Sequence, residues 1–184
     1  MAHRWHADPL VWGHGPRLLE VFQEPTCPFS VKTFNKLDEF LSQAGKDNVR
    51  VQIWLHSQPW HLYSGIVIRA IIAASTLEGG KDNAYRIMDA VGKHRDEFVF
   101  EDHCRGANRR TTPDEVLQRL EEYSGVALTP AFDTPDLERE IKRHAKYSRQ
   151  NGIHGSPTFM VDGLIDPGMG SGDEVSEWVK RLLE

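Results

Sequence analysis

The sequence has few cysteines and no long hydrophobic run, and each shortage excludes a class of protein. Its 184 residues include two cysteines, Cys27 and Cys104, too few for a disulfide framework. No apolar run approaches the roughly 20 residues that a membrane-spanning helix needs. A net charge of −5, without a basic stretch, argues against nucleic acid or an anionic membrane as a partner. What remains is a globular chain whose length suits one domain, with or without a subdomain.

The first residues and the number of cysteines also give an expectation for the cellular location of the protein. Residues 1–9 lack the apolar stretch of a secretory signal. Two cysteines in such a chain are expected to be free thiols in a reducing environment. The sequence therefore predicts a cytoplasmic protein. No metal site is expected, because His103, Cys104 and the other histidines lack a recognised ligand spacing.

The hydrophobic pattern predicts an α/β chain with a helical block in its middle. The apolar runs at 10–12 and 18–22 indicate a strand pair, or a strand preceded by an extended arm. Three-to-four spacing predicts one helix over 29–44, and alternation predicts a strand over 49–55. After the helical block come a strand, an Asp-Gly hairpin turn, a second strand and a last helix. The block itself comprises helices at 62–77, 83–93, 113–124 and 137–150, and the last four elements span 158–161, 162–163, 164–165 and 173–183.

Cys27 lies between a predicted strand and a helix that begins with Pro28. Free backbone N–H groups and the positive end of a helix favour an anion, and the thiolate is the nucleophilic form of cysteine. Ser30 follows one turn later, and its hydroxyl could donate a hydrogen bond to the Cys27 sulfur. Alternatively, Cys27 is a small apolar residue of the core.

A second motif, Gly155-Ser156-Pro157-Thr158-Phe159, places a proline directly before the strand at 158–161. Together with Cys27-Pro28-Phe29-Ser30, it resembles the thioredoxin superfamily, in which the active-site cysteine faces a cis-proline loop. The helical block between the two motifs resembles the DsbA-like branch. The resemblance covers nearly the whole chain. It implies a thioredoxin-like mixed sheet flanked by helices (1–58 and 150–184) with an inserted all-helical subdomain (59–149).

The same resemblance implies thiol-disulfide exchange. Cys27 would be the catalytic nucleophile and Ser30 the second catalytic residue. The substrate-binding residues would be Pro28, Phe29, Ser156 and Pro157. The bond before Pro157 is expected to be cis, and the backbone of Ser156 is expected to pair with an extended substrate peptide.

The sequence departs from the family at two positions. Ser30 stands where most redox-active relatives carry a second cysteine, and Phe29 stands where DsbA proteins carry a histidine. A serine cannot resolve a mixed disulfide, so another thiol must do so. Glutathione or a cysteine of the substrate is the candidate, whereas nothing places Cys104 within reach. The expected partners are therefore a protein thiol or disulfide, or glutathione as co-substrate. No tightly bound cofactor is expected, and the sequence does not predict the oligomeric state.

Two other readings stay open. The chain also resembles kappa-type glutathione transferases and chromene-carboxylate isomerases, and a thioredoxin-like domain without a second cysteine can bind partners without turnover. Among the histidines, His154 is a candidate proton acceptor for Cys27. His56 and His61 are expected either to line the substrate face or to cap the following helix. The remaining residues of that segment, Trp60, Tyr63 and 66–68, are expected in the core.

Overall fold

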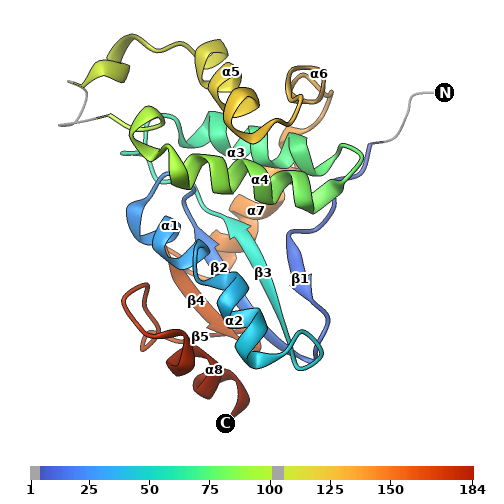
Figure 1. Cartoon of the computed structure of the whole chain (residues 1–184), viewed down its shortest axis with the longest axis vertical. Coiled ribbons are helices and arrows are strands. Elements are labelled where there is room, and N and C mark those ends of the chain that lie inside the picture. The colour runs from blue at the N-terminus through green and yellow to red at the C-terminus, as the bar shows by residue number, and fades with distance from the viewer. Residues whose placement is uncertain (1–4, 101–105) are drawn as a thin grey trace.

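The protein forms one mixed β-sheet with helices on both faces and a helical layer at one end (Figure 1). The computed structural model describes residues 5–100 and 106–184. The strand order is β1-β3-β2-β4-β5; β2 and β3 are parallel and the other neighbours antiparallel. The strands span Val11–Gly13 (β1), Arg17–Gln23 (β2), Val49–Leu55 (β3), Thr158–Val161 (β4) and Leu164–Ile165 (β5).

The strand formed by the first apolar run, β1, pairs with β3 and not with β2, the next strand in the sequence. β1 lies antiparallel to β3, not beside β2, with Val11 opposite Gln52. Gly13 permits this arrangement, since its φ of 78° favours glycine and a Cβ there would lie 2.4 Å from the carbonyl oxygen of Val49. As a result β2, which leads to Cys27, lies at the centre of the sheet.

The single helix predicted over 29–44 is two helices, α1 (Pro28–Phe34) and α2 (Leu37–Ala44). The backbone tightens between them, where the Lys36 N–H donates to the carbonyl of Thr33 at 3.0 Å. The Lys36 ammonium then donates to the carbonyls of Ser171 and Asp173, at 3.0 and 2.5 Å. Periodicity alone missed this break because the apolar spacing continues across it.

Alternating strand residues fill two separate cores. One core lies between the sheet and helices α2 and α8 (Val175–Leu183), where Trp178 is fully buried. The opposite face is covered by α7 (Glu138–Gln150), which Figure 1 shows behind the sheet. Its core is aromatic and consists of Phe22, Trp54, Met160 and Ile153, with Tyr147 packed against them.

The segment between β3 and β4 is helical, as predicted. It contains α3 (Ser64–Ser75), α4 (Gly80–Lys93), α5 (Pro113–Ser124), α6 (Thr129–Phe132) and α7, with 3₁₀ turns at Arg95–Glu97 (η1) and Ala107–Arg110 (η2). Figure 1 shows α3 to α6 together at one end of the sheet. The short α6 was not predicted. The proposed division at 58/59 and 149/150 stays a prediction, and α7 packs directly against β3.

One residue expected in the core is on the surface. Trp60 is 67% exposed, because α3 starts only at Ser64 and the preceding loop faces outward. Tyr63, in contrast, is buried as predicted, and its hydroxyl donates to the carbonyl of Asn108. Within 5–100 and 106–184, no helix has the length and apolar character required to cross a membrane.

Candidate active site

Cys27 occupies the turn between β2 and α1, at the carboxyl end of the central strand. Its N–H donates to the carbonyl of Glu24 at 3.0 Å, which closes the turn. Its own carbonyl accepts from Val31 at 2.9 Å and so begins the helix, with Pro28 at the first helical position. Cys27 is therefore the N-cap residue of α1, and its side chain is 6% exposed.

The loop before β4 faces this cysteine. The Cys27 Sγ atom lies 3.6 Å from the carbonyl oxygen of Ser156, within reach of a weak S–H···O hydrogen bond. The bond between Ser156 and Pro157 is cis, the isomer that the motif predicts. Strand pairing brings the cis-proline loop to Cys27, because Thr158 lies opposite Phe22 near the ends of β4 and β2. Two segments 129 residues apart thus form one site.

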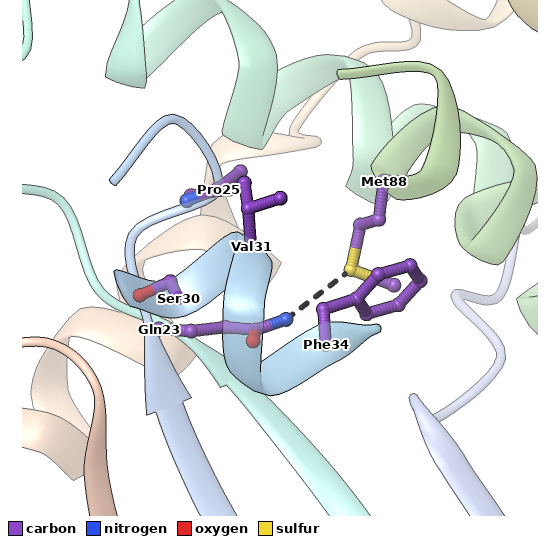
Figure 2. Close-up of a pocket in the computed structure, with 6 residues that line it drawn as sticks. All are labelled: Gln23, Pro25, Ser30, Val31, Phe34 and Met88. Atoms are coloured by element: carbon purple, nitrogen blue, oxygen red, sulfur yellow. Dashed lines mark hydrogen bonds between the residues drawn. The ribbon is translucent and has the colours of Figure 1, made fainter. Parts of the chain in front are cut away.

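The expected hydrogen bond from the Ser30 hydroxyl to the Cys27 sulfur is not formed in the described structure. Ser30 is buried, and its Oγ has no hydrogen-bond partner among the residues that the structure describes. It lines a cavity of about 10 Å³ beneath α1, near the lower limit for one water molecule (Figure 2). Gln23 spans this cavity, and its Nε2 donates to Met88 Sδ at 3.6 Å. The other lining residues are Pro25, Val31 and Phe34. A catalytic role for Ser30 stays a prediction.

A fully buried carboxylate, Glu24, lies beneath the turn. One of its oxygens accepts from both the backbone N–H and the hydroxyl of Thr26, each at 2.8 Å. The other accepts from the N–H of Gln58 at 3.4 Å. Arg95 Nε donates to the Thr26 carbonyl at 2.7 Å. Glu24 was not predicted as a site residue, because a glutamate before a proline at a strand end is typical of an exposed turn.

Of the three candidate histidines, only His61 is hydrogen-bonded to the turn. Its Nδ1 lies 3.1 Å from the Oγ1 of Thr26. Burial lowers the pKa of His61; the nearby Arg95 guanidinium adds to this effect, and the Glu24 carboxylate opposes it. Neither His56 nor His61 caps α3, whose N-cap is Tyr63 without a side-chain hydrogen bond.

His154 and His56 lie near each other beside the cis-proline loop. Burial lowers the pKa of His56, and the positive charges of His154 and Arg149 lower it further. His154 itself is exposed, and its backbone carbonyl accepts from Gln58 Nε2 at 3.3 Å. No hydrogen bond joins its ring to Cys27 within the described chain, so its role as a proton acceptor stays a prediction.

Apolar side chains are exposed around the site. Phe29, two residues after Cys27, is 62% exposed, and Trp60 and Leu62 flank His61 with exposures of 67% and 56%. Such surface suits contact with a substrate. Phe29 stays a predicted substrate-binding residue, as do Pro28, Ser156 and Pro157. The segment that includes His103, Cys104 and Arg105 lies outside the described residues.

Comparisons with solved structures identify relatives over almost the whole chain. A protein from Pseudomonas syringae, provisionally described as a protein-disulfide isomerase, is 60% identical, with a TM-score of 0.93 over 95% of this chain and 98% of its own. DsbA2 of Pseudomonas aeruginosa is 17% identical, with a TM-score of 0.62 over 99% of this chain and 100% of its own. Oxidised BdbD of Bacillus subtilis is 14% identical, with a TM-score of 0.68 over 98% of this chain and 99% of its own. No family model and no curated protein matches.

The prediction of a cytoplasmic location is wrong by this comparison. The matched structures are DsbA-like oxidoreductases, a class that is typically periplasmic. The inference rested on the first nine residues, and the absence of an apolar stretch there does not fix the compartment. A disulfide-exchange protein needs only its reactive thiol chemistry, whichever compartment surrounds it.

The comparisons confirm the predicted fold class, a thioredoxin-like mixed sheet with a helical insertion. The relative at 60% identity matches this chain over 95% of its length, an extent that shows a shared family. The chain belongs to the DsbA-like family of thiol-disulfide oxidoreductases.

Proposed function

We propose that this enzyme exchanges thiols and disulfides through Cys27 alone. The Cys27 thiolate attacks a protein or glutathione disulfide, forms a mixed disulfide and releases one thiol. A second thiol, from glutathione or from the substrate, then releases Cys27. When that second thiol belongs to the substrate protein, the outcome is disulfide isomerisation.

The observation that carries this proposal is the contact between Cys27 Sγ and the Ser156 carbonyl, 3.6 Å apart. It places the sulfur beside a backbone segment whose polar groups can pair with an extended substrate. Ser30 supplies no thiol, and its hydroxyl lines the cavity beneath α1. The exposed side chains of Phe29 and Trp60 provide apolar surface for a polypeptide substrate.

The test uses Cys104→Ser protein incubated with oxidised glutathione and then with reduced glutathione. Mass spectrometry should show one glutathionyl group added to Cys27 and then removed. The matched control, Cys27→Ser in the same background, should take up none.

Two results would contradict the proposal. One is a Cys27 that forms no adduct, which would favour a domain that only binds its partners. The other is conjugation of glutathione to an aromatic electrophile without any mixed disulfide on Cys27, which would favour a transferase.

A further inference from the structure

We propose that Glu24, Thr26 and His61 form a proton-accepting chain for the thiol chemistry at Cys27. In this chain the Nε2 atom of His61 takes the proton from the thiol that resolves the mixed disulfide. The inference rests on the proposed function, because only a single-thiol enzyme depends on an incoming thiol for release. The inference gives Glu24, Thr26 and His61 a role in the chemistry at Cys27, in addition to their hydrogen bonds within the turn.

The hydrogen bonds fix the direction of the chain. The Thr26 hydroxyl has one proton, and it lies 2.8 Å from the Glu24 carboxylate and 3.1 Å from His61 Nδ1. A charged acceptor makes the stronger hydrogen bond, so the hydroxyl donates to Glu24. Nδ1 of His61 must then carry its own proton and donate to Thr26. This tautomer leaves a lone pair on Nε2, the atom able to accept a proton.

The position of His61 suits an incoming thiol. Thr26 and Cys27 are consecutive, so their Cα atoms are about 3.8 Å apart, and the imidazole contacts Thr26 directly. His61 is only partly buried, and its neighbours Trp60 and Leu62 are exposed. The imidazole therefore lies against the residue that precedes Cys27 and is partly open to solvent.

Two charged groups act on this histidine, Glu24 from the turn below and Arg95 from η1. Burial, and less strongly Arg95, lower the pKa of His61 against the opposing effect of Glu24, which favours the neutral imidazole that can accept a proton. Once it is protonated, the buried carboxylate stabilises the imidazolium through the Thr26 hydroxyl. The arrangement follows the general logic of a nucleophile, a base and a group that orients the base.

The resolving step begins with a proton transfer. An incoming thiol RSH gives its proton to His61 Nε2 and becomes a thiolate. The thiolate attacks the substrate sulfur of the Cys27 mixed disulfide, forming a new S–S bond as the bond to Cys27 breaks. Cys27 leaves as a thiolate, and the imidazolium returns its proton to that sulfur or to solvent. One disulfide replaces another, so no external oxidant or reductant is needed.

The test isolates this step. Cys104→Ser protein is loaded with glutathione on Cys27, and its release by reduced glutathione is timed from pH 6 to pH 9. His61→Gln should slow release at least about tenfold near pH 7, within the usual range for a general base. The deficit should shrink as the pH approaches about 8.5, where thiols ionise without help. A merely structural role would slow release equally at every pH.

Thr26 provides the matched pair of variants. Thr26→Val removes the hydroxyl and keeps the shape, and should reproduce part of the His61→Gln deficit with the same pH dependence. Thr26→Ser keeps the hydroxyl and should restore release. An unchanged pH profile in His61→Gln would overturn the proton chain while leaving exchange at Cys27 intact. A protein that cannot be loaded at Cys27 would instead refute the proposed function.

Discussion

Glu20, on strand β2, and Glu24, in the turn that follows this strand, are both buried but contact different groups. Glu20 lies on the α7 side of the sheet, where its carboxylate accepts from Trp54 Nε1 at 2.8 Å and from the Tyr147 hydroxyl at 2.9 Å. Glu24, the first residue after the strand, accepts from Thr26 and from the Gln58 backbone. Both carboxylates are almost inaccessible, with exposures of 2% and 0%.

The difference lies in where each hydrogen-bond network ends. Around Glu20, the rings of Trp54 and Tyr147 pack in a tilted arrangement with their centroids 4.2 Å apart, and burial together with the hydrogen bond to Glu20 raises the pKa of Tyr147 to about 12. The network of Glu24 continues through Thr26 to His61, next to the reactive cysteine. Both networks end at a partly buried side chain, but the one from Glu20 ends at Tyr147 on α7, whereas the one from Glu24 ends at His61, which contacts the residue before Cys27.

The largest expected change is a new activity at the Cys27 turn. Ser30→Cys should create rapid insulin reduction with dithiothreitol, at least about tenfold above the native chain, because a thiol one turn from Cys27 can resolve its mixed disulfide. The cavity beside Ser30 gives the larger sulfur room, so stability should stay within about 1 kcal/mol of the native chain.

The control for this prediction is Ser30→Ala, which should leave insulin reduction at the native level. If Ser30→Cys adds nothing while Cys27 remains reactive, the groove is built for glutathione or another small molecule. If the native protein already reduces insulin rapidly and Cys104→Ser abolishes this, Cys104 is the resolving thiol.

The second prediction compares the two glutamates directly. Glu20→Ala removes the acceptor of two buried donors and should lower the free energy of unfolding by about 2–3 kcal/mol, with exchange at Cys27 changed less than about twofold. Glu24→Ala should cost a similar amount and also slow the release of glutathione from Cys27. Urea unfolding and the release assay measure the two effects. Equal slowing of release by both variants would remove the distinction between the networks.

Most of the fold is predictable because its signals are local. The alternation at 49–55, the proline starts of α1 and α5 and the Asp-Gly hairpin each specify an element without help from distant residues. Two errors came from tertiary contacts. β1 pairs with β3, and the tether from Lys36 to the loop before α8 accompanies the break between α1 and α2. No periodicity contains that information.

The site was only partly predictable for the same reason. Cys27 and Pro157 stand in two motifs that together resemble the thioredoxin superfamily, a resemblance that implies that they meet, and the structure brings the two segments together. Glu24 has no motif, since its burial depends on the loop after β3 folding over it to donate from Gln58. The direction of the Ser30 hydroxyl likewise depends on the cavity between α1 and α4, which local sequence does not describe.

The third prediction concerns substrate contact. Phe29→Ser should raise the KM for a protein disulfide about fivefold, the effect of losing roughly 1 kcal/mol of apolar contact, and leave glutathione exchange unchanged. Leu164→Ser is the matched control, because Leu164 is 77% exposed on the edge strand β5. It should alter neither reaction. An equal effect of Phe29→Ser on both substrates would argue against a polypeptide-binding surface there.

The smallest expected effect tests whether the α7 side serves stability alone. Burial opposes ionisation of Glu140, but hydrogen bonds from His144 and Arg143 outweigh it and lower the pKa of Glu140 to about 2, from 4.5. A depressed carboxyl pKa stabilises the fold fully above pH 4.5, and this contribution is lost as the pH falls toward 2. Since Arg143 is nearly half exposed, the expected contribution is only about 1 kcal/mol.

Glu140→Gln should therefore unfold at lower urea concentration than the native chain at pH 7, and the gap should close between pH 4.5 and pH 2. His144 does not remove the effect, because the Leu55 N–H holds its ring by donating to Nδ1 at 3.0 Å, a hydrogen bond that does not involve Glu140. Glutathione release from Cys27 should be identical in the two proteins at pH 7. A gap that persists at pH 2 would show that Glu140 acts through packing rather than charge. A change in release would show that the α7 side is coupled to the chemistry of Cys27.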